Sequence, residues 1–471
     1  MSAPLLAVSA YMLMQLGIGV WVSRRIRTES DYLLGGRTLG YTLATFSIFA
    51  TWFGAETVVG SAGVAYSSGI SLRNAEPFGY GLCLLLMGLL FAVPLRARRI
   101  TTLADLFRDA FGVTVERAAA LVLIPSSILW AAAQIRAFGH VLAVSSGGLD
   151  VSTAIGIAAV FTILYTAFGG LLVDAITDMI QGVMLIAGIT VVFVAVVRLA
   201  GGPIDFFSIV TSQQAAHEVL RTPQPWFATL EEWAIPVLGS VVATELVGRI
   251  AAARSPGVAR TSSLAAAPLY LIVGSMPLLV GVVGPQLMPG LADAEAIMPA
   301  IAHSILSPVL FALFAGALVS AILSTVDSTL LISSGLLSHN VIVPVLAIQS
   351  ERARVRIARG GVIVFGVIAF VLALRSDGVL TLVEAASAFG GPAAVVLTCF
   401  ALWSRFGGPR AALACVISSP AAYLAGLALD LPYPFLASLA TAVLAFLAFG
   451  LVEPRRDKPA PTLTMRMMDD R

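Results

Sequence analysis

The chain has 471 residues, of which 58% are hydrophobic and only 11% are charged, and its formal net charge is +2. Globular domains in water carry about 25% charged residues, so this composition excludes a soluble fold and predicts an all-α polytopic membrane protein. The three cysteines and four histidines show neither a disulfide framework nor a metal-ligand spacing. No phosphate-binding loop, catalytic constellation or basic patch is visible in the sequence, so we expect neither an enzyme nor a nucleic-acid-binding protein.

Apolar runs of about 20 residues predict about 13 transmembrane helices. The run at 304–338 is longer than a bilayer requires, so we expect it to tilt or to extend beyond the membrane. Residues 1–453 are expected to form one transmembrane domain, with a short amphipathic helix in the loop 201–229 and a disordered cytoplasmic tail at 454–471. The predicted spans are 3–22, 40–65, 76–95, 117–142, 151–168, 173–199, 230–252, 262–284, 304–338, 358–375, 379–402, 411–428 and 434–452.

Basic residues are distributed unevenly between alternate loops. If the N-terminus faces outward, most of the 28 lysines and arginines fall in the segments on the inner side. Short loops rich in basic residues stay in the cytoplasm. This pattern predicts an outer N-terminus, a cytoplasmic C-terminus and a multi-pass protein of the plasma (inner) membrane.

The second span, 40–65, makes a poor uniform helix because Gly54 and Gly60 flank an acidic residue, Glu56. Glycine and polar residues at mid-span favour a discontinuous helix whose free carbonyls face a cavity, as in the binding sites of secondary transporters. Close helix packing through small residues is the alternative interpretation. Trp52 lies beside the expected break.

The fourth span, 117–142, carries a second tryptophan at depth, Trp130. Two aromatic faces around one cavity suit an organic cation through cation–π attraction, although a single mid-span tryptophan more often packs in a core. Gln134 and Arg136, in the same span, are polar enough to line a cavity, and a pair between Arg136 and Glu56 is the alternative.

The sixth span, 173–199, places Asp174, Asp178 and Gln181 on one helix face. Charges on one stripe of a membrane helix normally face the bundle interior or a water-filled path. Asp178 is therefore a candidate sodium ligand or a relay toward the cytoplasm, with an ion pair to an arginine as the alternative. Asp174 is nearer the inner interface, and we expect it to be solvated.

The seventh and eleventh spans hold further polar or flexible residues. Glu245 and Arg249 are four residues apart, so we expect them to pair with each other; a solute-facing role for Thr244 or Glu245 is the second interpretation. In the eleventh span, Gly390 to Pro392 predicts an interrupted helix that can flex during gating.

The ninth span combines sufficient length to cross a bilayer with a polar centre, Ser324, Thr325, Asp327 and Ser328. An acidic residue inside a span is costly and is usually functional. Two neutral hydroxyls are ligands of the kind that a small hard cation such as sodium prefers. The alternative is that these hydroxyls bond back to the preceding turn or hold neighbouring helices together.

These motifs together resemble the sodium:solute symporter family, across essentially all of residues 30–450. The resemblance implies a leucine-transporter-type fold of two five-helix inverted repeats with a broken first core helix, one leading helix and two trailing helices. The repeats would be about 40–199 and 230–402. The residues that carry the resemblance are Gly35-Gly36-Arg37-Thr38-Leu39-Gly40, Tyr165-Thr166-Ala167-Phe168-Gly169-Gly170 with Thr177-Asp178 and Gln181, and Leu323-Ser324-Thr325-Val326-Asp327-Ser328.

In the family, one sodium ion lies between the broken helix and the eighth core helix. Matched residue by residue, the resemblance implies sodium ligands at Ala50, Phe53, Ala321, Ser324 and Thr325. Some members hold a second sodium, which here would involve Asp178, Ser324, Asp327 and Ser328. A single sodium with Asp178 on its exit path is equally compatible.

Parts of the chain are similar to the high-affinity choline transporter branch, in which aromatic rings enclose a trimethylammonium group. The seventh-span tryptophan expected in that branch aligns near Ala243, so one aromatic wall is missing and the resemblance extends to another amine or a betaine-like solute. The predicted substrate-binding residues are Trp52, Glu56, Thr57, Trp130 and Thr244.

The sequence thus predicts a sodium-coupled symporter that imports a small organic solute by alternating access. Sodium, a small-molecule substrate and the lipid bilayer are the expected partners, with no obligate protein partner. The alternatives are proton coupling, a substrate of another class such as an amino acid, monocarboxylate or sugar, and, less favoured, a solute sensor or a channel.

Overall fold

The computed structural model describes residues 3–24, 26–71, 75–146, 148–220, 225–291, 293–376 and 378–453. Across these ranges the chain is helical, and the one extended pairing is an isolated bridge between Leu39 and Ala253. The predicted cytoplasmic tail, 454–471, lies outside the described residues. The all-α prediction is confirmed for the described part of the chain.

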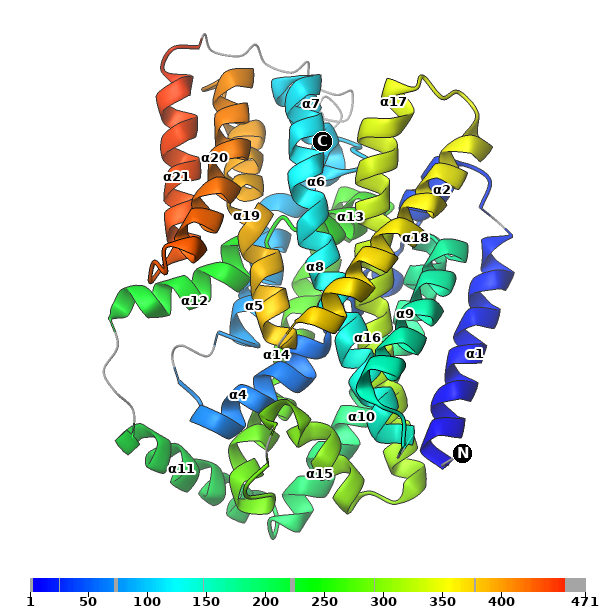
Figure 1. Cartoon of the computed structure of the whole chain (residues 1–471), viewed down its shortest axis with the longest axis vertical. Helices are drawn as coiled ribbons and strands as arrows, with labels where there is room; N and C mark the ends of the chain where they lie inside the picture. The colour runs from blue at the N-terminus through cyan, green and yellow to red at the C-terminus, as the bar shows by residue number, and fades with distance from the viewer. Residues whose placement is uncertain are drawn as a thin grey trace.

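The helices form a bundle, with α16 in its middle and α20 and α21 along one side (Figure 1). Helices α11 and α15 lie at the end of the bundle where the N-terminus lies, and α7 and α17 lie at the opposite end. The helices are α1 (Ala3–Ser23), α2 (Glu29–Leu34), α3 (Tyr41–Trp52), α4 (Ser61–Ser68), α5 (Phe78–Leu86), α6 (Ala92–Ala97), α7 (Leu103–Phe111), α8 (Val113–Ser146), α9 (Val151–Phe168), α10 (Leu171–Leu199), α11 (Pro203–Leu220), α12 (Trp226–Leu238), α13 (Thr244–Ala252), α14 (Pro256–Leu287), α15 (Ile297–Ile305), α16 (Pro308–Leu337), α17 (Val343–Val345), α18 (Glu351–Arg375), α19 (Val379–Trp403), α20 (Pro409–Ala428) and α21 (Pro434–Gly450).

Every predicted span has a helical counterpart. Within the described residues, nine helices are long and apolar enough to cross a membrane, and a bent pair, Tyr41–Trp52 with Glu56–Ser68, makes a tenth. Ser9–Ser23 and Pro434–Gly450 are shorter apolar helices at the ends of the bundle. The span predicted at 304–338 continues through α16 to Val345, which agrees with its excess length. The helix expected in the loop 201–229 is α11.

The second span is broken, as its glycines predicted. Helix α3 ends at Trp52, and a π-helical segment, η2 (Glu56–Gly60), leads into α4. The two halves are bent by 56°. A Cβ added at Gly54 would lie 2.4 Å from Glu56 Oε2 and 2.9 Å from Gln134 Nε2, so a larger residue at the break would displace these side chains.

The seventh span is also broken, which the single prediction at 230–252 missed. Its first half is α12 and its second half is α13, and residues 239–243 between them are not helical. The backbone of α19 lies against this break, since a Cβ on Gly391 would lie 2.3 Å from the Gly239 carbonyl oxygen. Neither glycine leaves room for a side chain, so the two backbones meet closely here.

The prediction of an interrupted eleventh span is wrong in this conformation. Helix α19 runs without a break from Val379 to Trp403, through Gly390, Gly391 and Pro392. The small residues serve close packing instead, because Gly390 N donates to Ser126 Oγ at 3.1 Å and Gly391 abuts Gly239.

Helix α16 forms the centre of the bundle, and every residue from Phe314 to Leu336 is buried. It packs against α8, α10, α18 and α3. A helix that is covered on all sides has no lipid-facing stripe, so its polar residues face other protein groups.

Candidate functional site

The break in the second span is bonded directly to the polar centre of α16. Ser324 Oγ donates to the Ala50 carbonyl at 2.6 Å, and Thr325 Oγ1 donates to the Thr51 carbonyl at 3.0 Å. Both hydroxyls also lie within hydrogen-bond distance of the Ala321 carbonyl, at 3.0 and 3.1 Å. We call Ser324, Thr325 and the carbonyls of Ala50 and Thr51 the hydroxyl clamp.

The clamp follows from the end of a helix. The last four carbonyls of a helix have no partner within it, and α3 ends at Trp52, so the carbonyls of Ala50 and Thr51 need donors from elsewhere. The side chains of Ser324 and Thr325 supply them. The hydroxyls of Ser324 and Thr325 therefore have a structural role as donors to the end of α3, in addition to any role in binding a cation.

Four of the five residues predicted to bind sodium meet at the clamp, namely Ala50, Ala321, Ser324 and Thr325. The fifth, Phe53, is the C-cap residue of α3. The clamp presents hydroxyl and carbonyl oxygens from two helices within hydrogen-bond distance of one another. That set of neutral oxygens fits a small hard cation.

A buried charge cluster, Asp174, Asp178, Asp327 and Arg249, lies next to the clamp. The Arg249 side chain is fully buried and donates to Asp174 and to Asp178, the second at 3.3 Å. Its Nε donates to Thr51 Oγ1 at 3.2 Å. The cluster thus joins α10, α13, α16 and the last turn of α3.

Two predictions are corrected by this cluster. Arg249 pairs with Asp174 and Asp178, whereas Glu245 accepts a hydrogen bond from Ser127 Oγ at 2.5 Å. The expected pair between Glu245 and Arg249 is therefore wrong, because α13 presents the two side chains to different neighbours. Asp174 is 3% exposed, so the prediction that it is solvated is also wrong.

The residues proposed for a second sodium lie together, but with a cation already among them. Arg249 donates to Ser328 Oγ and to Asp178 Oδ2, and Ser47 Oγ also donates to Asp178 Oδ2 at 2.5 Å. Asp327 accepts from the Ser328 amide at 2.8 Å. In this conformation the guanidinium bonds to two of the oxygens predicted for a second sodium, while Asp178 Oδ1 and Asp327 Oδ2 have no hydrogen-bond partner among the described residues.

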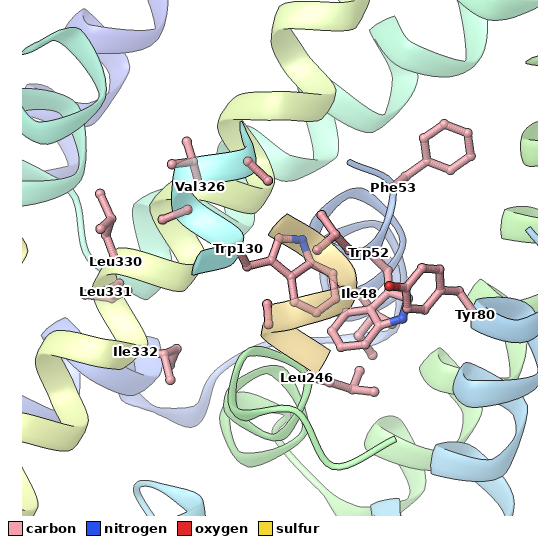
Figure 2. Close-up of a cluster of buried hydrophobic side chains, with 14 of the residues drawn as sticks. Ile48, Trp52, Phe53, Tyr80, Trp130, Leu246, Val326, Leu330, Leu331 and Ile332 are labelled. Carbon is pink, nitrogen blue, oxygen red and sulfur yellow. The ribbon is translucent and has the colours of Figure 1, made fainter. Parts of the chain in front are cut away.

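An aromatic cluster lies on the other side of the break. Trp52, Tyr80 and Trp130 face one another, with Leu246 of α13 close beneath them and Phe53 turned away (Figure 2). The Trp52 and Trp130 ring centroids are 5.7 Å apart, and Tyr80 lies 6.4 and 6.1 Å from them. Tyr270 completes the cluster at 6.4 Å from Tyr80. The two predicted tryptophans are therefore brought together by α3 and α8, with two tyrosines that the sequence reasoning missed.

Glu56 is fully buried beside the break. Gln134 bonds to two groups at the break. Gln134 Nε2 donates to Glu56 Oε2 at 2.8 Å, and Gln134 Oε1 accepts from the Ala55 amide at 3.0 Å. The expected alternative pair between Arg136 and Glu56 does not form, since Arg136 donates to the Ala373 carbonyl at 3.1 Å.

A second carboxylate, Glu76, joins the aromatic cluster from the segment before α5. Glu76 Oε1 accepts from the Tyr270 hydroxyl at 2.7 Å, and Thr57 Oγ1 lies 2.5 Å from the same hydroxyl. Because the Tyr270 proton goes to Glu76, the Thr57 hydroxyl donates to Tyr270. This places the predicted residue Thr57 in a hydrogen-bond chain that ends on a carboxylate.

A small cavity of about 20 Å³ lies beside Trp130, at the break between α12 and α13. It has room for about one water molecule. Predicted residue Thr244 lines it together with Glu245 and Ser127, and the Ser127 and Thr244 hydroxyls are 3.2 Å apart. Trp52, Tyr80, Trp130 and Tyr270 are buried, so the centre of the molecule is closed in this conformation.

The signals for the missed residues were weak in the sequence. Tyr270 lies inside an ordinary apolar span, and Glu76 lies where a span begins, where charged residues are common. Only a contact between distant segments connects them to Thr57 and the break.

A separate polar network closes the end of the bundle where α16 ends. Asn340 Nδ2 donates to Asp105 and to Glu116, at 2.9 and 2.8 Å, and His339 lies 3.4 Å from Asp105. Burial raises the pKa of Asp105, but hydrogen bonds from His339 and the Thr101 amide and the nearby positive charges outweigh it and lower the pKa to about 2. This network ties α7 and α8 to the end of the central helix.

The fold and the site define a helical membrane transporter, in which two broken helices meet a central polar helix. The sodium:solute symporter family model matches residues 32–418. The chain therefore belongs to the sodium:solute symporter family. The predicted family is confirmed.

The relatives that the chain resembles carry the names of transporters for different solutes. The chain is 28% identical to the human high affinity choline transporter 1 over 409 residues, which cover 80% of this chain and 68% of that protein. The chain is 26% identical to the Drosophila melanogaster high-affinity choline transporter 1 over 399 residues, which cover 79% of this chain and 62% of that protein. The match therefore spans less than two thirds of that protein. The Escherichia coli sodium/pantothenate symporter is 26% identical over 478 residues, covering 96% of this chain and 97% of that protein.

Solved structures share the fold. The substrate-bound, outward-open structure of a Na⁺-coupled sialic acid symporter superposes with a TM-score of 0.84 at 20% identity, covering 97% of this chain and 99% of that one. A nucleobase-cation-symport-1 family transporter in a closed conformation gives a TM-score of 0.60 at 18% identity, covering 88% and 92%. The predicted leucine-transporter-type fold is confirmed.

Proposed function

We propose that this protein imports a small organic cation together with sodium by alternating access. The observation that carries the proposal is the hydroxyl clamp, in which Ser324 and Thr325 of α16 bond to carbonyls of the broken helix at 2.6 and 3.0 Å. The same oxygens that hold sodium in this proposal therefore hold the break beside the aromatic cluster. Membership of a sodium:solute symporter family supports sodium as the coupling ion.

Sodium at the clamp would link ion binding to the shape of the solute site. An ion held by Ala50, Ala321, Ser324, Thr325 and the predicted Phe53 carbonyl fixes the end of α3. Trp52 is the last residue of that helix, so the ion also fixes one wall of the aromatic cluster. Since coupling is reciprocal, solute binding must raise sodium affinity by the same factor.

We propose one sodium ion per cycle. The Arg249 guanidinium already bonds to Asp178 and Ser328, so a tethered cation stands in the place of the second ion. Asp178 then lines the route by which sodium leaves the clamp, and Asp327 and Ser328 shape the cluster around Arg249. Uptake driven by a pH difference without sodium would instead support proton coupling through these carboxylates.

The solute is proposed to bind among Trp52, Tyr80 and Trp130, with Glu56, Thr57 and Thr244 on the adjoining surfaces. Aromatic faces attract organic cations. The choline transporters among the relatives support this class, and the missing aromatic side chain at Ala243 separates this site from theirs.

The direction of transport follows from the proposed topology, with the N-terminus outside, the C-terminus in the cytoplasm and the chain in the plasma (inner) membrane. The predicted repeats, 40–199 and 230–402, each begin near one of the two broken helices.

Thermal unfolding of the purified protein in sodium and in potassium tests this proposal. A ligand at 100 times its Kd adds about 2.7 kcal/mol of stability, so organic cations should raise the Tm in sodium and much less in potassium. The variant with Ser324→Ala and Thr325→Ala should lose the difference between the two salts. Equal responses of the native protein in both salts would contradict sodium coupling.

A further inference from the structure

Two carboxylates at the aromatic cluster, those of the buried Glu56 and the half-buried Glu76, each keep one buried oxygen that has no hydrogen-bond partner among the described residues. These oxygens are Glu56 Oε1 and Glu76 Oε2. Buried acceptors are nearly always satisfied, and each exception calls for an explanation. Trp130 Nε1, in the same aromatic cluster, also has no partner among the described residues.

In each carboxylate, only one of the two oxygens accepts a hydrogen bond from a described protein group. Glu56 Oε2 is held by Gln134 and lies close to Gly54 at the break. Glu76 Oε1 is held by Tyr270. If these carboxylates were only structural, their second oxygens would be expected to find protein donors as well.

Among the residues that the structure describes, no cationic side chain pairs with either carboxylate. In the described part of the chain, neither Glu56 nor Glu76 forms a salt bridge, and the cluster between them is made of aromatic rings. A buried carboxylate without a counter-ion is costly. A solute that enters this cluster with a positive charge relieves that cost, and the ring faces add a second attraction.

The open oxygens select the kind of cation. A quaternary ammonium carries a positive charge but no N–H group, so it leaves both acceptors unsatisfied. A protonated primary amine has three N–H donors, as the lysine side chain shows. Charge-assisted bonds between such donors and carboxylates are about twice as strong as neutral ones.

We propose that this site binds a solute with a protonated primary or secondary amine, and that Glu56 and Glu76 accept hydrogen bonds from its N–H groups. The inference rests on the proposed function and narrows its substrate class. It separates this chain from carriers of trimethylammonium groups, whose aromatic enclosure needs no hydrogen-bond acceptor. Glu76 and Tyr270 become specificity-determining residues in addition to Glu56.

Matched probes that differ only in N-methylation test this assignment. We would measure binding of 2-aminoethanol and choline, and of 1,4-diaminobutane and its fully N-methylated bis-quaternary form, to the purified protein in sodium. Hydrogen bonds to charged groups contribute about 1.5–3 kcal/mol, so the amine of each pair should bind about 10- to 100-fold tighter than its methylated partner.

Glu76→Gln and Glu56→Gln each remove a charge with little change of shape, and each should cut this preference by at least about tenfold. Glu384→Gln, the same substitution at an exposed position of α19, is the matched control and should keep it. A retained sodium response in thermal unfolding shows that each variant is folded.

The possible results separate the two proposals. If the quaternary probes bind as well as the amines, or if both glutamate variants keep the full preference, the inference is overturned while cation transport stands. If no probe of either kind binds in sodium, the proposed cation substrate fails, and this inference fails with it.

Discussion

Replacing Arg249 with leucine should destabilise the protein strongly, and sodium should repair part of the loss. Arg249 is fully buried and bonds to Asp174, Asp178 and Ser328. Removing one partner of a buried ion pair costs about 3–5 kcal/mol because the other charges stay buried and unpaired. Here three carboxylates would remain without the guanidinium.

The loss of stability in Arg249→Leu should also depend on the salt. With the arginine gone, Asp178, Asp327 and Ser328 offer free oxygens of the kind a cation binds. A sodium ion that enters this space stabilises the variant by mass action. The Tm of Arg249→Leu should therefore rise more steeply with sodium concentration than the Tm of the native protein, and potassium should have a smaller effect.

Thermal unfolding in a sodium series at constant ionic strength measures both effects. Arg249→Lys keeps the charge but not the planar fork, so it should lose less stability and gain no additional sodium dependence. A leucine variant that melts like the native protein in potassium would refute the role given to the arginine. A sodium response equal in both proteins would refute its role as a substitute for the second ion.

Three other substitutions have expected outcomes. Gly54→Ala places a Cβ 2.4 Å from Glu56 Oε2, so it should displace the carboxylate, cost about 1–3 kcal/mol in thermal unfolding and weaken solute binding; unchanged affinity would contradict this. Gly391→Ala meets the Gly239 backbone at 2.3 Å and should cost at least as much, which a normal Tm would disprove. The pKa of Asp105 is lowered to about 2, so its contribution is present above its unfolded pKa of about 3.9 and is lost as the pH falls toward 2. Asp105→Asn should therefore cost about 2 kcal/mol at pH 7 and little at pH 2, and an equal loss at both pH values would argue against it.

The parts of the site that the sequence predicted well depend on local patterns. Gly54 and Glu56 at mid-span signalled the break, and Ser324 with Thr325 signalled a polar centre in an apolar helix. A helix end needs donors for its last carbonyls, and a buried hydroxyl needs acceptors. The carbonyls at the end of α3 need donors and the hydroxyls of α16 need acceptors, so a contact between these two groups could be expected from the sequence.

The parts that the sequence could not predict depend on helix rotation and on contacts between distant segments. Glu245 and Arg249 are four residues apart, and that spacing suggested a local pair. In the bundle, Arg249 instead meets α10 and Glu245 meets α8. Spacing along one helix cannot say which neighbour offers a better partner.

The second break was missed for a similar reason. The sequence 230–252 is apolar enough to be read as one span, and the backbone that packs on its interruption belongs to Gly391, far away in the chain. The role of Glu76 likewise depends on Tyr270 of α14. Such contacts become visible only once the helices are assembled.

The most direct test of the account is uptake into proteoliposomes at fixed pH, driven by a sodium gradient, with a potassium gradient as control. The native protein should accumulate an organic amine only with inward sodium. The hydroxyl clamp variant, with Ser324→Ala and Thr325→Ala, loses about 2 kcal/mol of interaction at about 1 kcal/mol per hydroxyl. It should therefore need roughly 30-fold more sodium for the same rate. Sodium-driven uptake that is unchanged in this variant would contradict the central claim that sodium acts at the clamp.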